Sequence, residues 1–205
     1  MVRYPKDRKE QTRRRIVEAA SRAYREQGVS GVGIGELMQS VGLTHGGFYA
    51  HFPSKDALVA EACDRGVSEL SSRLFAEAEE RGGADGLRLL IRGYVSRLHR
   101  DDPGVGCTMP SLAADVSRAA PEVRAGFTRT LRRFLARVAE LLPSRAEEAP
   151  AEEPPDEALV LASGMVGAVL LARAVDDPEL SDRILLAARR FYTGAFAEGA
   201  GRAPE

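Results

Sequence analysis

The spacing of apolar residues follows the helical period along nearly the whole chain. Ile16, Ala20 and Tyr24, for example, recur every four positions, which places them on one face of a helix. The same spacing predicts helices over residues 8–27, 34–41, 54–81, 85–100, 111–118, 121–142, 156–175 and 180–196, and one more short helix from residue 44. No stretch shows the alternation of a half-buried strand. The sequence therefore predicts an all-α protein.

Residues 33–55 carry the pattern of two short helices joined by a tight turn. The first helix has an apolar face that consists of Ile34, Leu37, Met38 and Val41. Gly42 follows at once, where a chain leaving a helix commonly needs a positive φ. Thr44 then offers a hydroxyl cap for the second helix. This arrangement predicts a helix-turn-helix, whose second helix lies in the major groove of DNA with its first residues at the base edges.

The second helix begins with His45, Gly46 and Gly47, which have little bulk. A glycine weakens a helix by roughly 1 kcal/mol relative to alanine. That cost is tolerated where a backbone must approach another molecule closely, so this end is the expected contact with the bases.

Later residues of the second helix are predicted to point either into the core or toward solvent. Phe48 and Phe52 lie four residues apart and can anchor it to a core. Tyr49 and His51 then face outward. The alternative for Tyr49 is a place in the core.

These residues resemble those of a known protein family. The segment is similar to the DNA-binding domain of the TetR (tetracycline-repressor) family of bacterial transcriptional regulators, over about a quarter of the chain. The match runs from about Thr12 to Leu58. It is carried by Gly42-Leu43-Thr44, Gly46, Phe48-Tyr49, His51-Phe52 and Ser54-Lys55-Asp56-Ala57-Leu58. The chain departs from the family pattern at Gly33, Met38, His45 and Gly47, where Thr or Ser, Ala, Lys and Thr are usual.

The resemblance implies how the chain is organised and which residues meet DNA. We expect an N-terminal three-helix helix-turn-helix domain over residues 1–53, a C-terminal helical ligand-binding and dimerisation domain over 54–198, and a disordered tail over 199–205. Tyr49 and Lys55 are then phosphate contacts, with His51 a further candidate. Near the bases or the phosphate backbone we place Arg13, Arg14, Thr44, His45, Gly46 and Gly47.

The net charge of −1 is unevenly distributed along the chain. Residues 1–55 hold ten Lys or Arg and five Asp or Glu, whereas the remainder holds nineteen and twenty-five. A basic N-terminal part is expected if only that part meets phosphate, although a solvated arm gives the same balance.

The segment Leu159 to Ala174 is apolar almost all round. A helix of this kind must be buried on every side, either as the core helix of one subunit or against a partner subunit. The resemblance implies a homodimer whose interface is a four-helix bundle of the last two long helices of each subunit. The interface candidates are Val160, Gly164, Gly167, Ala168, Leu171, Leu186 and Arg190.

The resemblance also implies a small-molecule inducer that binds among the C-terminal helices. The protein is then a ligand-responsive repressor that binds a near-palindromic DNA operator and releases it when the inducer binds. By residue type and place, the pocket candidates are Tyr94, Leu98, Cys107, Met109, Phe127, Leu131 and Met165. For each of them, plain core packing is the alternative.

Cys107 offers a second form of regulation, because it lies in a glycine-rich junction before a short helix. A thiol near a helix N-terminus can have a lowered pKa, and the thiolate is the reactive form. One hypothesis is therefore a repressor that senses electrophiles or oxidants through Cys107. The alternative is a small buried residue.

Other classes of function lack their motifs. No apolar run reaches the length of a membrane span and the N-terminus has no apolar signal core, which predicts a cytoplasmic protein without a membrane partner. The cysteines and histidines show no metal-ligand spacing, so no metal or other cofactor is expected. Neither a nucleophile elbow, nor a P-loop, nor a zinc-protease motif occurs, so an enzyme is not expected. A DNA-coating protein and an activator stay open beside the repressor.

Overall fold

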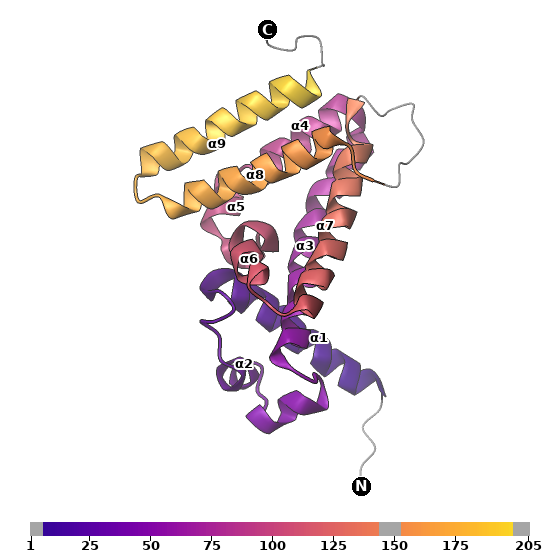
Figure 1. Ribbon diagram of the computed structural model, residues 1–205, viewed down its shortest axis with the longest axis vertical. Coiled ribbons are helices and arrows are strands. Elements are labelled where there is room, and N and C mark those ends of the chain that lie inside the picture. The colour runs from indigo at the N-terminus through magenta and orange to yellow at the C-terminus, as the bar shows by residue number, and fades with distance from the viewer. Residues whose placement is uncertain (1–5, 144–152, 199–205) are drawn as a thin grey trace. The chain divides into compact units, whose positions relative to one another are not determined.

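The computed structural model describes residues 6–143 and 153–198, and these residues form helices and connecting loops without a strand (Figure 1). The prediction of an all-α protein is confirmed. In chain order the elements are α1 (Lys6–Gln27), α2 (Ile34–Ser40), the 3-10 helix η1 (His45–Ala50), α3 (Lys55–Arg81), α4 (Gly83–Tyr94), α5 (Arg97–Asp101), the 3-10 turn η2 (Pro103–Val105), α6 (Thr108–Ser117), α7 (Pro121–Glu140), α8 (Asp156–Ala174), α9 (Pro178–Tyr192) and the π-helical turn η4 (Thr193–Ala197).

The chain divides into two compact units. The first unit contains the chain up to Ser68 together with Pro103–Arg129, and the second contains Glu69–Asp102 and the chain from Thr130. This division differs from the expected domain boundary at residue 53. Side chains beyond residue 53 pack into the same core as the N-terminal helices. In that core Ile16 of α1, Phe48 of η1 and Leu58 of α3 are all fully buried.

The first unit also contains a buried polar cluster around Arg25 of α1, which is 5% exposed. The guanidinium donates to the carbonyl oxygen of Gly104 and, at 2.7 Å, to the hydroxyl of Ser21. The Ser21 hydroxyl donates in turn to the carbonyl of Ala62 in α3 at 2.8 Å. These bonds tie α1, α3 and the η2 segment together, and they meet the requirement that a buried charge be hydrogen-bonded.

Gly66 of α3 makes room for this cluster. A Cβ atom at Gly66 would lie 2.1 Å from the Arg25 guanidinium and 2.2 Å from the Thr108 hydroxyl. Since Thr108 donates from that hydroxyl to the carbonyl of Cys63 at 3.1 Å, a side chain at Gly66 would break bonds from two elements.

In the second unit, α8 and α9 lie side by side as an antiparallel pair (Figure 1). The Ser181 hydroxyl of α9 donates to the carbonyl of Ala172 in α8 at 2.6 Å. Arg173 of α8 donates to the carbonyl of Arg100 at 3.1 Å, at the end of α5 where helix carbonyls lack partners. The pair is therefore joined to α5 by polar contacts.

Two predicted helices differ from the observed ones. The predicted helix 85–100 is interrupted, since Val95 and Ser96 leave the helical conformation and Ser96 starts α5 by accepting from the amide of His99 at 3.1 Å. The helix predicted from residue 111 begins earlier, at Thr108. Pro110 lies within its first turn, where a missing N–H costs no hydrogen bond.

The expectation that no apolar run could span a membrane is wrong. By length and composition alone, α8 is long and apolar enough, with a mean hydropathy of 1.6 over its best window and 39% of that window buried. The leucines and valines of α8 give it this hydropathy, and they include buried Leu161 and Val169. Core helices of other proteins meet the same criterion, so the finding is weak evidence for a membrane span.

Candidate nucleic-acid interface

The turn between α2 and η1 is closed by backbone hydrogen bonds. Gly42 has φ of +74°, as predicted from its position after the helix. The amide of Leu43 donates to the carbonyl of Met38 at 2.9 Å, and the amide of Gly42 donates to Gln39 at 2.9 Å. This pattern satisfies carbonyls at the end of α2 and sets the direction in which η1 leaves the turn.

The second helix of the motif is η1, a 3-10 helix of six residues. The prediction of a Thr44 hydroxyl cap is wrong: Thr44 is extended, and its side chain makes no capping hydrogen bond. The carbonyl of Thr44 accepts instead from the amide of Gly47 at 3.0 Å. Adjacent glycines favour the α-helix poorly, and 3-10 geometry occurs in such short pieces.

Aromatic side chains hold η1 to the core and leave one ring outside. Phe48 and Phe52 are buried and stacked, with ring centroids 5.6 Å apart. Tyr49 is 62% exposed and meets Phe48 edge-on at 5.2 Å. Tyr49 is therefore not a core residue, and its hydroxyl lies on a rigid, outward-facing support.

Within residues 6–143 and 153–198, nothing requires the two glycines of η1. Neither has a positive φ. A Cβ atom at Gly46 would have no neighbour within 4 Å, and one at Gly47 would make ordinary contacts of 3.6 Å and 3.8 Å with Thr44 and Met38. Their lack of side chains leaves an open backbone beside the exposed His45.

The structure gives Lys55, expected as a phosphate contact, a second and internal role. The half-buried ammonium donates to the carbonyls of Val29 at 2.8 Å and Val32 at 2.7 Å. It thereby ties the start of α3 to the segment that joins α1 and α2. One of its three N–H groups is left for any other acceptor.

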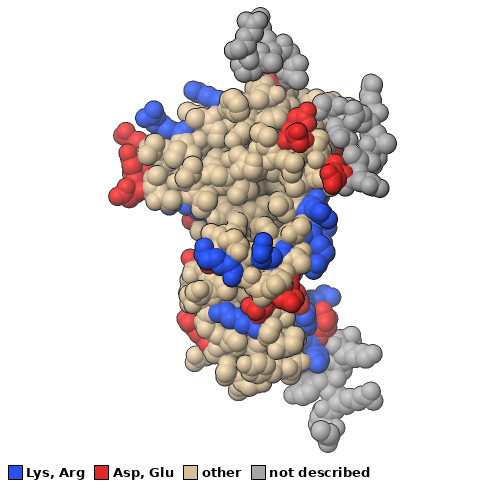
Figure 2. Space-filling model, viewed as in Figure 1, with Lys and Arg blue, Asp and Glu red and all other residues tan. Residues whose placement is uncertain are grey.

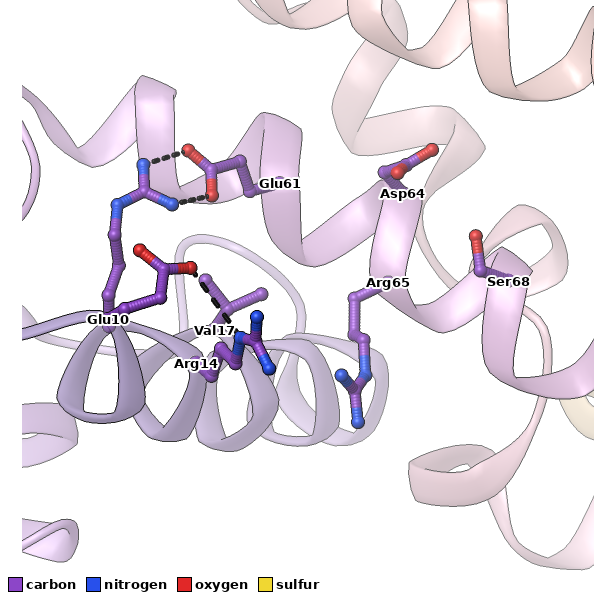
Figure 3. A pocket seen from close by; sticks show the side chains of 8 residues that line it. Glu10, Arg14, Val17, Glu61, Asp64, Arg65 and Ser68 are labelled. Carbon is purple, nitrogen blue, oxygen red and sulfur yellow. Dashed lines mark hydrogen bonds and ion pairs between the residues drawn. The ribbon is translucent and has the colours of Figure 1, made fainter. Parts of the chain in front are cut away.

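Arg13 is engaged within the first unit, although it was expected to reach DNA. Both of its terminal nitrogens donate to the Glu61 carboxylate of α3, and the guanidinium lies 4.5 Å from the Phe52 ring centroid. Arg13 and Glu61 line a pocket of about 300 Å³ together with Arg14 and Glu10, and Figure 3 shows the two hydrogen bonds that Glu61 accepts. Arg14 is more exposed and pairs with Glu10 at 3.5 Å.

His51 follows η1 and is half-buried. Burial, and then the positive charges of Lys9 and Arg13, lower the pKa of its imidazole. Its buried Nδ1 has no hydrogen-bond partner among the described residues. The ring is therefore held in its neutral form near Lys9 and Arg13, and its buried nitrogen faces the protein and not the surface.

Sequence reasoning missed two residues that position the motif. Arg15 donates to the carbonyl of Val41 at 3.0 Å and so holds the end of α2. Glu61 orients Arg13. The helical period shows which face of a helix each residue lies on. It does not show that positions 13 and 61 come together, because tertiary packing decides that.

Charged groups of both signs lie in small clusters on the face shown in Figure 2, and most of that face carries neither. In that view no single basic surface covers the molecule. Preference for DNA would then depend on the particular groups around η1 and α1 more than on a uniform field.

The predicted ligand-pocket residues lie in both units. Cys107, Met109 and Phe127 belong to the first unit, and Tyr94, Leu98, Leu131 and Met165 to the second. The placement of Leu98 in a pocket wall is wrong for the isolated chain, because its side chain is 74% exposed. Tyr94 and Met165 are fully buried, which is also what core packing requires.

Both cysteines are buried thiols. Burial raises the pKa of Cys63 to about 12, which removes its nucleophilic form at neutral pH. Cys107 is 1% exposed, and its sulfur accepts from the amide of Met109 at 3.4 Å as the cap of α6. In this conformation Cys107 is a structural residue, which disfavours the thiol-sensing alternative.

The predicted dimer residues separate into two groups. Ala168 is buried within its own subunit, and a Cβ atom at Gly164 would lie 1.9 Å from the hydroxyl of Tyr192. These two small residues serve the packing of α8 within one chain. Val160, Leu171, Leu186 and Arg190 are exposed, and Gly167 has open space beside it.

Among residues 6–143 and 153–198 no group of three His, Cys, Asp or Glu side chains could hold a metal ion.

Comparison with known proteins bears on these features. The family model of bacterial regulatory proteins of the tetR family matches residues 16–62. The HTH-type transcriptional regulator AcrR of Shigella flexneri is 35% identical over 79 residues, which cover 38% of this chain and 34% of AcrR. The chain therefore matches about a third of the length of that curated relative.

Solved structures extend the likeness in fold. The reduced form of E. coli NemR has a TM-score of 0.74 at 23% identity, covering 93% of this chain and 99% of NemR. AibR, solved with isovaleryl coenzyme A and operator DNA, has a TM-score of 0.62 at 18% identity, covering 88% and 97%.

Fold and motif together define the class, a helix-turn-helix protein with a helical C-terminal part. Within that class, residues 16–62 match the helix-turn-helix domain of the tetR family of bacterial regulatory proteins, and the chain shares its fold with regulators such as NemR. The curated relatives AcrR and TtgR are both HTH-type transcriptional regulators.

Proposed function

We propose that this protein is a transcriptional repressor that binds operator DNA through η1 and the start of α1. One observation carries the proposal. The exposed end of η1 combines an open glycine backbone, which its own fold does not require, with an outward tyrosine held by a buried stacked pair. His45, Gly46 and Gly47 would lie nearest the bases, and Tyr49 and His51 nearest the phosphates.

The repressor would act as a homodimer that joins α8 and α9 of two copies. Large apolar side chains exposed on this pair support the interface: Leu159, Val160, Leu170 and Leu171 on α8, and Leu180 and Phe191 on α9. Contiguous exposed apolar surface is costly in water and commonly marks an interface. Two-fold symmetry would then present two copies of η1 about 34–36 Å apart, or a multiple of it, to a near-palindromic operator.

We further propose that a small molecule releases the operator. AibR was solved with both a ligand and operator DNA, and the likeness in fold makes a similar arrangement reasonable here. Release requires the ligand to bind the DNA-free conformation more tightly than the DNA-bound one. The protein would act in the cytoplasm, where a bacterial regulator meets its DNA.

Selection of bound duplexes from random sequence tests the proposal. We expect a near-palindromic site whose half-sites are one helical turn, or a multiple of it, apart, bound by two copies of the chain. Anisotropy titrations with the selected site and with a scrambled duplex measure the preference. Binding of all duplexes alike would identify a DNA-coating protein, and a single half-site bound by one copy would remove the dimer.

A further inference from the structure

The second unit has a cavity of about 450 Å³ beside α9, and none of the predicted pocket residues lines it. Its lining includes side chains of α9 and one of α5: Arg97, Asp182, Arg183, Leu185, Leu186 and Arg189. Cavities of roughly 300–1,000 Å³ are the usual size for small-molecule sites.

The single acidic group of this lining is already neutralised. Arg97 donates to both oxygens of the Asp182 carboxylate, through Nε at 2.9 Å and through a second, closer nitrogen. Arg100 also donates to Asp182, at 2.8 Å. Asp182 therefore orients two guanidinium groups and has little capacity left to pair with the other arginines of the cavity.

Two arginine side chains of the lining are left without a partner. The guanidinium groups of Arg183 and Arg189 form no hydrogen bond or ion pair with any residue in the described parts of the chain. The Nε atom of Arg189 is also buried, so water does not satisfy it. A buried donor without a partner is costly, and a bound anion would relieve that cost with charge-assisted bonds.

Leu185 and Leu186 supply an apolar wall between these arginines. Leu185 is buried and Leu186 is partly exposed, so an apolar group lying on them would remove surface from water. The cavity thus combines cationic forks with an apolar floor, whereas a site for a free inorganic ion would need only the former.

We propose that this cavity binds a small amphiphilic anion, with its carboxylate or phosphate on Arg183 and Arg189 and its apolar body on Leu185 and Leu186. Guanidinium groups bind both head groups in a bidentate manner, so the shared chemistry is an oxyanion on a short hydrocarbon. The site lies in the second unit and is independent of operator recognition.

Calorimetric titration of the full chain with octanoate, without DNA, tests the site. Octanoate binds, whereas acetate and octanol bind at least tenfold more weakly because each lacks one half of the ligand. Octyl phosphate distinguishes the two head groups: if it binds more tightly than octanoate, the natural ligand is a phosphate ester and not a carboxylate. Absence of binding by both octanoate and octyl phosphate, or equal binding of octanol, overturns the proposal.

Matched variants locate the binding. Arg189→Gln and Arg183→Gln each weaken the affinity for octanoate about tenfold, as expected for loss of a hydrogen bond to a charged group. Arg132→Gln removes the same charge from an exposed position of α7 outside the cavity and leaves the affinity within twofold. Circular dichroism checks folding and sedimentation checks the oligomeric state of each variant. Unchanged affinity in both cavity variants, or a partner subunit that fills the cavity and excludes octanoate, refutes the site.

Discussion

Alanine at the two glycines of η1 should move stability and DNA binding in opposite directions. Gly46 and Gly47 have no positive φ, and their Cβ positions are open or make only ordinary contacts. Replacement of glycine by alanine at such positions stabilises a protein by about 0.4–1 kcal/mol, because the unfolded chain loses freedom. We therefore expect Gly46→Ala and Gly47→Ala each to raise the melting temperature by about 1–4 °C.

The same substitutions should weaken operator binding. If the backbone of η1 approaches the base edges, a methyl group at Gly46 displaces it from contacts that contribute roughly 1–3 kcal/mol each. The expected loss is about tenfold or more in affinity for the selected operator. Binding to scrambled duplex should change far less, since phosphate contacts supply nearly all of nonspecific binding.

Gly126→Ala is the matched control for both measurements. Gly126 lies inside α7, where a Cβ atom would make an ordinary contact of 3.5 Å with Ala60. This variant should gain stability in the same way and bind the operator unchanged. Urea unfolding and fluorescence anisotropy measure the two quantities. If Gly46→Ala and Gly47→Ala bind the operator as tightly as the unaltered protein, close approach of the η1 backbone is refuted.

Three further perturbations test the first unit. Gly66→Ala should lower the unfolding free energy by about 2–4 kcal/mol by breaking the Arg25 and Thr108 hydrogen bonds, as urea unfolding would show, and a loss below about 0.5 kcal/mol would mean that the cluster rearranges freely. Lys55→Met should cost about 1–3 kcal/mol of stability but leave the salt dependence of DNA binding unaltered, whereas a slope reduced by about 1 would restore Lys55 as a phosphate contact. Because the native pKa of His51 is lowered, its contribution to stability is complete above the unfolded pKa of about 6.5 and is lost as pH falls toward the native pKa. His51→Gln should therefore flatten the loss of unfolding free energy between about pH 7 and pH 5, and identical pH profiles would contradict this reasoning.

Local chemistry made much of the motif predictable. The positive φ of Gly42 and the burial of Phe48 and Phe52 follow from the backbone freedom of glycine and from helical spacing. The partners of Lys55 and Arg13 were not predictable in the same way. Each partner is set by which carbonyl or carboxylate the tertiary fold brings near. Residue type does not help, because a lysine or arginine can equally contact a DNA phosphate or form a hydrogen bond inside the protein.

The break between α4 and α5 is a second feature that could not be predicted from the sequence. Apolar spacing continues through Val95 and Leu98, so periodicity predicted one helix. The observed Ser96 cap competes with that period, and Leu98 consequently points to solvent. Ser96 can be recognised as the N-cap of α5 only if α4 is already known to end before it. Tertiary packing thus decided between two locally acceptable conformations.

The discontinuous first unit limits how this protein can be dissected or recombined. Leu112, Val116 and Val123 come from the stretch Pro103–Arg129, yet they fill the same core as the helix-turn-helix. A fragment cut after Ser68 would lose that packing and would leave apolar surface of α1 and α3 bare. A chimera that grafts this helix-turn-helix unit onto another protein must therefore carry α6 and the first half of α7 with it, or supply substitutes of matching shape.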